Sequence, residues 1–346
     1  MIADVISKLK NKNNLSYDEI SNAMDDILRG NISDENTRDF LKFLRDKGET
    51  DDELCGMLDK MLAFAIHISP KSKGRIIDVC GTGGDNLKTF NISTTASFVI
   101  AAAGGIVAKH GNRSVSGVSG SADIFEYFGY DLNSSPERVT KIIEKFGIGF
   151  IFAQKFHPAM KNVANARKMI GGRTIFNLLG PLSNPARVKN QLIGVYSEEF
   201  LQRIVSLLKK RGFENVMTVR SNDGLDELST TSKNHVCFLK NGIITSSIID
   251  PEKLGLSKPK IKEIQVNNKD DAISAFLSVL NNSANNAMVE ITALNAAGGL
   301  IVANIAKNFE EAIEIALDTI KSGIAFSLFE DFVRYCGDVK ILERFE

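Results

Sequence analysis

Five short apolar runs, each rich in β-branched residues, recur through the middle of the chain and alternate with segments of helical pattern. They read RIIDVC, GIVAKH, GIGFIFA, NQLIGVY and ENVMTV, and they begin at residues 75, 105, 147, 190 and 214. Strands that alternate with helices pair in parallel, because each helix carries the chain back to the same edge of the sheet. We therefore expect an α/β fold whose mostly parallel central sheet is flanked by helices.

The pattern changes on either side of these runs. VCFLKNGIITSSI, at residues 236–248, places Asn241 and Gly242 between two apolar stretches, which predicts a β-hairpin. After about residue 270 the periodicity is helical again, and the first seventy residues carry helical patterns throughout. The pairs Ser16/Glu19 and Thr50/Glu53 have the spacing of capping boxes, which mark helix starts.

The length of 346 residues predicts two domains, one of them discontinuous. We expect a small helical domain at residues 1–72, joined by a helical segment near 158–186, and a larger α/β domain at residues 73–346. Hydrophobic residues make up 43% of the chain and the formal net charge is zero, so the chain can bury a large core and has no general attraction to nucleic acid or to anionic lipid. A small-molecule ligand is expected.

The four cysteines lie far apart and form no C-x-x-C pair, which argues against a zinc cluster or a disulfide framework. The N-terminus mixes apolar and charged residues, unlike a signal peptide, and no run is long enough to span a bilayer. These features predict a cytoplasmic protein that binds neither membrane nor nucleic acid.

CGTGGDNLKTFNIST, at residues 80–94, follows the first expected strand and leads into a helix that begins near Ser93. Glycines allow backbone N–H groups to approach an anion closely, and a helix N-terminus adds unpaired donors and partial positive charge. The loop is neither a Walker loop nor a G-x-G-x-x-G fingerprint. Taken alone, it is equally well explained as a glycine-rich turn followed by a capped helix.

A second loop of similar kind, IVAKHGNRSVSGVSGSAD at residues 106–123, favours phosphate binding. It offers Lys109, His110, Asn112 and Arg113 before Ser121 opens another helix. Two such loops at the ends of successive strands suit a ligand with more than one phosphate, because open α/β sheets bind ligands at that edge.

HPAMKNVANARKMIGGRTIFNLLGPLSNPA, at residues 157–186, contains a helix that begins near Pro158 and carries Arg167. The planar guanidinium of an arginine suits a carboxylate, although most arginines on helices are simply exposed to solvent.

NDGLDELS, at residues 222–229, supplies Asp223, Asp226 and Glu227 in a loop after the strand at 214–219. Adjacent acids in a loop are usually only solvated. Beside a diphosphate, however, they would suit Mg²⁺, which prefers one or two carboxylates together with phosphates and waters, and Ser93 could add a hydroxyl.

Taken together, the motifs GTGGD, NIST, KHGNR, SGSAD, HPAMKNVANAR, RTIFNLLGPLSNP and DGLDELS resemble, in order and spacing, those of the anthranilate phosphoribosyltransferase family. The resemblance runs from end to end and includes the segment NAAGGL at residues 295–300. It implies a helical domain and an α/β domain of the nucleoside phosphorylase and phosphoribosyltransferase type, an active site at the hinge, and a homodimer formed through the helical domains. It also implies an enzyme of tryptophan biosynthesis that uses Mg²⁺, with two ions per subunit, to join anthranilate to 5-phosphoribosyl 1-diphosphate and release pyrophosphate.

The resemblance also implies the site residues. Those for the phosphoribosyl donor are Gly81, Thr82, Gly83, Gly84, Asp85, Thr89, Asn91, Ser93, Thr94, Lys109 and Ser121. Those for anthranilate are Gly81, His110, Asn112, His157, Arg167, Gly180 and Pro181. The implied Mg²⁺ ligands are Ser93, Asp226 and Glu227, and the implied catalytic residues are Lys109, Asp226 and Glu227. Because the amine of anthranilate is neutral at pH 7 and attacks by itself, no nucleophilic side chain is needed, and His110 is not expected to be an essential base.

Two departures from the family pattern are visible. Arg220 and Ser221 stand where the family often has a histidine and a glycine, and Gly117 replaces a common serine. Two other functions stay open from the sequence. A nucleoside phosphorylase of related fold would lack the long RTIFNLLGPLSNP and DGLDELS motifs, and a non-enzymatic nucleic-acid-binding relative should be strongly basic and should have lost its acid pair.

Overall fold

The computed structural model describes residues 2–83, 87–114 and 117–345, which fall into two compact units. The helical unit contains the chain up to His67 together with Ala153–Arg187. The α/β unit contains Ile68–Phe152 and the chain from Val188 onward. Among the described residues, no helix has both the length and the apolar character needed to cross a membrane.

The helical unit is built from four N-terminal helices and a later helical segment. The first four are α1 (Ile2–Lys10), α2 (Tyr17–Arg29), α3 (Asp34–Lys47) and α4 (Asp51–Ala63). The later segment comprises α8 (Ala153–Phe156), a short 3₁₀ turn (Pro158–Met160), α9 (Lys161–Ile170) and α10 (Ile175–Leu182). In this unit α9 packs against α2 and α3, and α10 packs against α4.

Both capping boxes expected from the sequence form in the helical unit. The side chains of Ser16 and Glu19 satisfy the backbone N–H groups that open α2, and Thr50 and Glu53 do the same for α4. Each box satisfies two of the backbone donors that a helix start leaves unpaired. The pattern-based prediction of these two helix starts is therefore confirmed.

A seven-stranded sheet forms the centre of the α/β unit, in the order β3-β2-β1-β4-β5-β6-β7. Its strands are β1 (Ile76–Gly81), β2 (Ile106–Gly111), β3 (Ile148–Phe152), β4 (Asn190–Gly194), β5 (Asn215–Ser221), β6 (Asn234–Lys240) and β7 (Ile243–Ile249). The first five pair in parallel, whereas β6 and β7 are antiparallel. The expected mostly parallel sheet and the hairpin at Asn241-Gly242 are both confirmed, and these two residues have positive φ angles of 52° and 73°, as a tight hairpin turn requires.

Strand β1 occupies the centre of the sheet, between β2 and β4. The chain first extends the sheet on one side of β1, through β2 and β3, and later on the other side, through β4 and β5. The strand order therefore reverses at β1, and the loops beyond the carboxyl ends of such strands are where open α/β sheets bind ligands.

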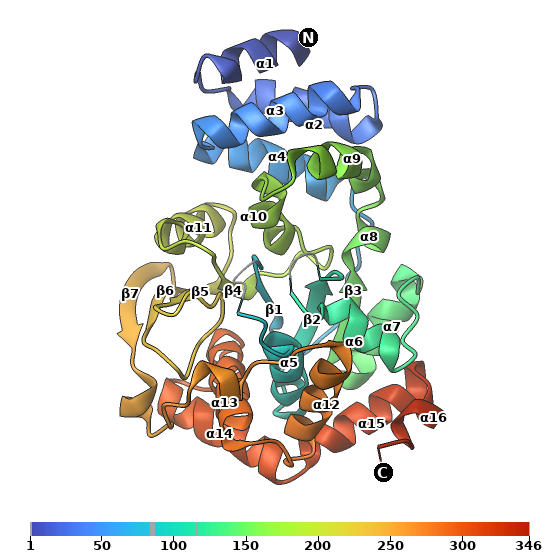
Figure 1. Cartoon of the computed structure of the whole chain (residues 1–346), viewed down its shortest axis with the longest axis vertical. Helices are drawn as coiled ribbons and strands as arrows, with labels where there is room; N and C mark the ends of the chain where they lie inside the picture. The colour runs from blue at the N-terminus through green and yellow to red at the C-terminus, as the bar shows by residue number, and fades with distance from the viewer. Residues whose placement is uncertain (1, 84–86, 115–116, 346) are drawn as a thin grey trace. The chain divides into compact units, whose positions relative to one another are not determined.

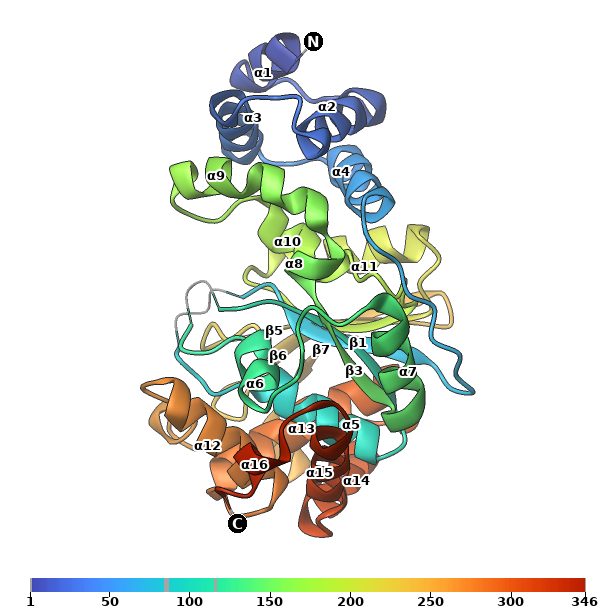
Figure 2. The same cartoon turned by 90° about the vertical axis from the view of Figure 1, so that its right-hand side faces the viewer.

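Helices cover both faces of the sheet, as Figures 1 and 2 show for the α/β unit. Helices α5 (Ile92–Ala102) and α13 (Asn286–Val302) lie against one face, and α12 (Lys269–Leu280), α14 (Phe309–Lys321) and α15 (Ile324–Cys336) pack outside them. Helix α11 (Glu199–Lys210) covers β5 and β6 from the opposite face. The remaining elements of this unit are α6 (Ser121–Tyr127), α7 (Pro136–Phe146), α16 (Val339–Leu342) and 3₁₀ turns at Pro251–Leu254 and Ile261–Glu263.

The core of the α/β unit centres on α5 and α13. Phe98 of α5 is 1% exposed and packs edge to face, in T-shaped pairs, with the rings of Phe276, Phe329 and Phe332. Gly299 of α13 leaves room for Ile100, since an added Cβ would overlap that side chain. This dense packing makes α5 and α13 rigid supports for the loops above them.

Candidate functional site

The glycine-rich loop after β1 meets the acidic loop after β5, although the two are 143 residues apart in the chain. The backbone N–H of Gly83 donates to Oδ2 of Asp226 at 2.6 Å. A side chain at Gly81 would overlap the Asp226 carboxylate, so only glycine fits there. Gly194, at the end of β4, is equally close, because an added Cβ would lie 1.5 Å from the Asp226 carbonyl oxygen. Two glycines, Gly81 and Gly194, thus make room for Asp226, and a third, Gly83, donates a hydrogen bond to it.

The rest of this loop is held by backbone contacts. The Thr82 N–H donates to the carbonyl of the last residue of β4 at 2.9 Å. Further along, Thr89 forms an isolated bridge with Gln265. Two predicted donor-binding residues, Gly84 and Asp85, lie outside the described residues.

The start of α5 brings the two glycine-rich loops together. Asn91, which precedes the helix, donates from Nδ2 to the carbonyl of Ser119 in the second loop, at 3.1 Å. Thr94 is buried in the first turn, and the Ser93 hydroxyl accepts a hydrogen bond from Lys109 at 3.3 Å. The unpaired N–H groups of a helix start and a lysine ammonium therefore lie in one place, an arrangement suited to an anion.

Lys109 lies in β2 and is only 2% exposed. Its ammonium donates to the carbonyl of Val79 at 2.8 Å and to the Ser93 hydroxyl, both of which are neutral oxygens. Burial lowers the pKa of Lys109, and the carboxylates of Asp78 and Glu227 oppose that change. The positive charge is therefore costly in the absence of a ligand, and a nearby anion would stabilise it.

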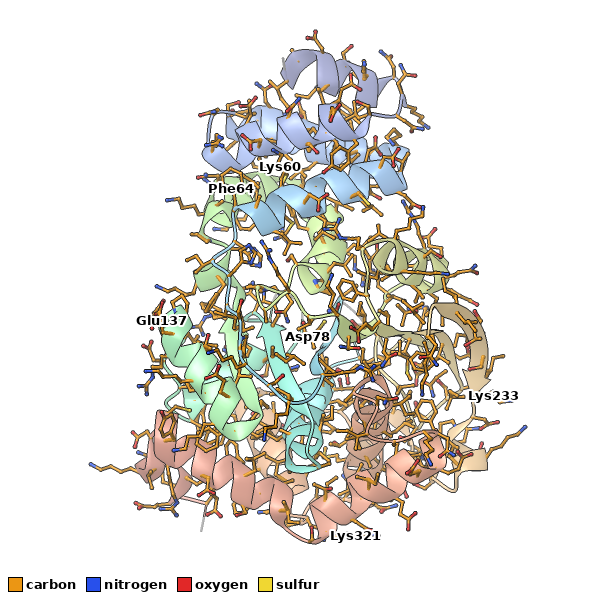
Figure 3. All side chains as sticks on the ribbon, turned by 180° about the vertical axis from the view of Figure 1, so that it is seen from behind. Lys60, Phe64, Asp78, Glu137, Lys233 and Lys321 are labelled. Carbon is orange, nitrogen blue, oxygen red and sulfur yellow. The ribbon has the colours of Figure 1, made fainter. Side chains whose placement is uncertain are left out.

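Asp78 lies within β1, labelled in Figure 3, and is fully buried. Its carboxylate accepts the backbone N–H of His110 from β2 at 3.1 Å and approaches Nε2 of Gln191, on β4, at 3.5 Å. This acid therefore links the three central strands just below the candidate site.

The second loop differs from expectation at one residue. His110 is 7% exposed, and the carbonyl of Asn112 accepts the Ser121 hydroxyl at 3.4 Å. Arg113, which the sequence offers as a second cation for phosphates, instead donates to both carboxylate oxygens of Glu126 at 2.6 Å. Arg113 is thus paired with an acid, whereas Lys109, among the described residues, donates hydrogen bonds to neutral oxygens.

The three acids of the acidic loop have different surroundings in the structure, and Asp223 is bound within the loop itself. Asp223 is turned into the loop and accepts hydrogen bonds from the hydroxyls of Ser229 and Thr231. Burial opposes ionisation of Asp223, but these and neighbouring hydrogen bonds outweigh it and lower the pKa. Asp226 is directed toward the glycine-rich loop, and the charge of Glu227 acts on Lys109. Spacing alone did not distinguish Asp223, which organises the loop, from the other two.

The chemistry of this donor set fits Mg²⁺. Asp226 and Glu227 supply hard carboxylate oxygens, and Ser93 supplies a hydroxyl that is hydrogen-bonded to Lys109, the residue on which the Glu227 charge acts. Within the described ranges, no three histidine, cysteine, aspartate or glutamate side chains gather as a ready-made cage. Mg²⁺ commonly binds through one or two carboxylates and takes its other ligands from substrate phosphates and water, so this set is sufficient.

The predicted anthranilate residues divide between the two units. Gly81, His110 and Asn112 belong to the α/β unit, and the helical unit contains the other four, His157, Arg167, Gly180 and Pro181.

Two of the four in the helical unit are titratable, and His157 is buried whereas Arg167 is partly buried. Burial lowers the pKa of His157 to about 4, so its ring is neutral at pH 7. Burial also lowers the pKa of Arg167, which stacks on the ring of Phe176 at 5.6 Å. Across the described part of the chain, no hydrogen bond or ion pair satisfies the Arg167 guanidinium, which suits a ligand carboxylate.

Several residues that shape the site were missed in the sequence. Gly194 and Asn295 position the acidic loop, and Asp78 and Gln191 lie beneath Lys109. Asp78 could have been found, because a lone acid inside an apolar strand needs a partner. Nothing in the sequence relates Gly194 or Gln191 to the site.

Two family models match the chain. The helical bundle domain of a glycosyl transferase family matches residues 3–65, and the a/b domain of a glycosyl transferase family matches residues 73–326. The fold and these two matches therefore define the chain as a member of a glycosyl transferase family with a helical bundle domain and an α/β domain.

Similar proteins narrow this class. A protein of Nitrosopumilus maritimus (strain SCM1) named anthranilate phosphoribosyltransferase is 63% identical over 343 residues, which is 99% of both chains. Another of that name, from Cenarchaeum symbiosum (strain A), is 44% identical and covers 97% of both. The chain belongs to the anthranilate phosphoribosyltransferase family, and the predicted enzyme class is confirmed.

Solved structures agree. The crystal structure of anthranilate phosphoribosyltransferase from Thermus thermophilus matches with a TM-score of 0.88 at 33% identity, covering 96% of this chain and 99% of that one. The Saccharomyces cerevisiae enzyme in complex with PRPP and Mg matches with a TM-score of 0.87 at 25% identity, covering 96% and 97%.

Proposed function

We propose that this enzyme transfers the 5-phosphoribosyl group of 5-phosphoribosyl 1-diphosphate to the amine of anthranilate, a step of tryptophan biosynthesis. The products are N-(5-phosphoribosyl)anthranilate and pyrophosphate. The observation that carries the proposal is the meeting of the glycine-rich loop, the start of α5, Lys109 and the acid pair of the β5 loop at neighbouring strand ends. Family membership supplies the identity of the two substrates.

The donor's diphosphate is bound by backbone N–H groups and by one lysine. The residues proposed to hold it are Gly81, Thr82, Gly83, Gly84, Asp85, Thr89, Asn91, Ser93, Thr94, Lys109 and Ser121. The buried ammonium of Lys109 stabilises the negative charge that grows on the leaving diphosphate, an effect that is strong where water is excluded. Ser93, Asp226 and Glu227 would hold Mg²⁺, two ions per subunit, and bound Mg²⁺ supplies further positive charge to the diphosphate.

Anthranilate is bound through its carboxylate and positioned for attack by its amine. The residues proposed for it are Gly81, His110, Asn112, His157, Arg167, Gly180 and Pro181. The guanidinium of Arg167 pairs with the carboxylate. The neutral amine forms the C1–N bond as the C1–O bond breaks, pyrophosphate leaves with the electron pair, and the amine loses a proton. No side chain acts as a nucleophile, and correct positioning of the amine adds to the acceleration that stabilisation of the leaving diphosphate provides.

The proposal includes a homodimer in the cytoplasm. The sequence resemblance implies the dimer, and the four cysteines, which are all free thiols, fit a reducing compartment. Sedimentation of the purified protein tests the dimer, and a monomer at micromolar concentration would contradict it.

Loss of anthranilate fluorescence tests the activity. The enzyme should consume anthranilate only when donor and Mg²⁺ are both present, and pyrophosphate should appear in equal amount. The matched pair Asp226→Asn and Asp223→Asn separates ligand binding from loop structure. Asp226→Asn should abolish donor binding without changing the free energy of unfolding, whereas Asp223→Asn should mainly destabilise the loop. Phosphate-dependent release of a nucleobase, or no turnover at all, would refute the proposed reaction.

A further inference from the structure

Asn295 connects the middle of helix α13 to the acidic loop. It is 2% exposed, and its side-chain amide both accepts and donates hydrogen bonds. Oδ1 accepts the backbone N–H of Leu228 at 3.0 Å, and Nδ2 donates to the backbone carbonyl of Leu228 at 2.7 Å and to that of Ile291 at 2.8 Å. One side chain therefore satisfies both backbone groups of a single loop residue.

Leu228 directly follows Asp226 and Glu227, so this contact fixes the chain just after the acid pair. The helix also leaves room for it, because a Cβ added at Gly298 would lie 2.9 Å from Cδ1 of Leu228. Helix α13 is buried along most of its length and packs against α5, which makes it a rigid support. The position of Leu228 is thus set from outside the loop.

The other supports of this loop hold different parts of it. Asp223 gathers the hydroxyls of Ser229 and Thr231, and Asn234 bonds both the N–H and the carbonyl of Ser229. These contacts shape the loop around itself and around β6. Asn295 differs because it ties the loop to helix α13, which packs against the sheet and against α5.

We propose that Asn295 is a positioning residue for the transfer reaction, holding Leu228 so that the Asp226 and Glu227 carboxylates are in place for the metal and diphosphate. The inference rests on the proposed role of that acid pair. An amide is needed because it both donates and accepts, whereas aspartate only accepts and leucine does neither. Groups that orient metal ligands commonly change metal affinity when they are replaced.

The test compares Asn295→Leu with Asn215→Leu. Asn215 is a matched control, since it is also a buried asparagine that bonds α13, through the Val302 carbonyl at 3.0 Å. It stands at the first residue of β5, at the opposite end of that strand from the acidic loop. If Asn295→Leu does not fold, Asn295→Asp keeps the size and removes the N–H donors.

Three measurements are made on each variant. Calorimetry with 5-phosphoribosyl 1-diphosphate gives the Mg²⁺ concentration for half-maximal donor binding. Hydrogen exchange of residues 222–233 in the ligand-free protein reports loop order, and thermal unfolding reports stability. We expect both variants to lower the melting temperature. Only the Asn295 variant should raise the Mg²⁺ requirement, by roughly tenfold to a hundredfold, and accelerate exchange at Leu225 and Ser229.

Equal Mg²⁺ requirement and equal loop exchange in the two variants would overturn the proposal, because Asn295 would then be an ordinary core residue. Failure of the proposed function gives another result. In that case donor binding to the unmodified enzyme would not depend on Mg²⁺, or Asp226→Asn would leave the dependence intact, while the exchange experiment would still report whether Asn295 orders the loop.

Discussion

Each of the two units buries a lysine, and the two lysines have different surroundings. In the helical unit, the Lys47 ammonium donates to the Glu53 carboxylate at 2.8 Å, and both side chains are nearly inaccessible, at 4% and 0% exposed. Glu53 also accepts the backbone N–H groups of Leu15 and Thr50. In the α/β unit, Lys109 donates to two neutral oxygens.

The difference distinguishes Lys47, whose charge is structural, from Lys109, whose charge can bind a ligand. The Lys47–Glu53 pair compensates both charges within the chain and ties α4 to the chain before α2, so a ligand would gain nothing there. Lys109 is shielded from water, and among the described residues its hydrogen bonds go to neutral oxygens, while Asp78 and Glu227 act on it only through their charges, so an incoming diphosphate would add a direct anionic partner. A buried cation is therefore informative about function only after its partners are known.

The largest effect is expected where the structural pair is broken. Glu53→Gln should leave the Lys47 charge buried without its partner and remove about 3 to 5 kcal/mol of the free energy of unfolding. Denaturant titration measures the loss. The folded fraction should keep its kcat/KM, and a proportional loss of kcat/KM in fully folded protein would place this pair among the functional charges. The double variant Lys47→Met/Glu53→Gln is the control, and it should recover part of the lost stability.

The ligand-directed lysine should behave in the opposite way. Lys109→Met should lower kcat/KM by roughly a hundredfold to a thousandfold, because the leaving diphosphate loses a buried positive charge. Its free energy of unfolding should change less than that of Glu53→Gln, because the cost of burying the ammonium is removed together with its attraction to Asp78 and Glu227. Steady-state kinetics and denaturant titration on the same sample check both. A destabilised but fully active variant would reverse the comparison.

Arg167 extends the comparison to a partly buried cation in the helical unit. Because no hydrogen bond or ion pair to the described residues satisfies it, Arg167→Ala should raise the KM for anthranilate by roughly tenfold to a hundredfold, corresponding to about 1.5 to 3 kcal/mol. The KM for the phosphoribosyl donor should change little. Arg173→Ala, further along the same segment, is a control for general loss of positive charge. An increase confined to the donor KM would move the acceptor site elsewhere.

His157 shows what happens to a buried base that has no compensating charge. Its pKa is about 4 in the folded protein against an ordinary value of 6.5, so below pH 6.5 the unfolded chain binds a proton that the folded chain does not. Stability present above pH 6.5 is therefore lost as the pH falls toward 4. Between about pH 7.5 and pH 5 this loss should be about 2 kcal/mol. Denaturant titrations of the native protein and of His157→Gln at both pH values isolate it, and identical pH dependence would show that other groups cause the loss.

The sequence predicted most of the fold from local patterns. The five β-branched runs became β1 to β5, the Asn241-Gly242 turn became the β6-β7 hairpin, and two capping boxes open α2 and α4. Each depends on interactions between near neighbours in the chain, which is why the residues alone indicate them. The domain limits of 1–72 and 73–346 stay a prediction, as do the roles of the individual site residues.

The candidate site was harder to predict from the sequence, because the roles of its side chains depend on long-range contacts. The motifs alone set Arg113 beside Lys109 and Asp223 beside Asp226 as equivalent groups. In the structure, Glu126 neutralises Arg113, and hydroxyls of its own loop surround Asp223.

What the sequence by itself determined was the set of elements, the family and the chemical types of side chain near the ligand. Only the tertiary structure decided which of those side chains remain for a ligand. Whether a charged side chain stabilises the fold or binds a ligand depends on the groups that pack against it. Those groups come from distant parts of the chain, as Gly83 and Asn295 do for the acidic loop. Parallel strand order brings those parts to one edge of the sheet, and no local pattern encodes that.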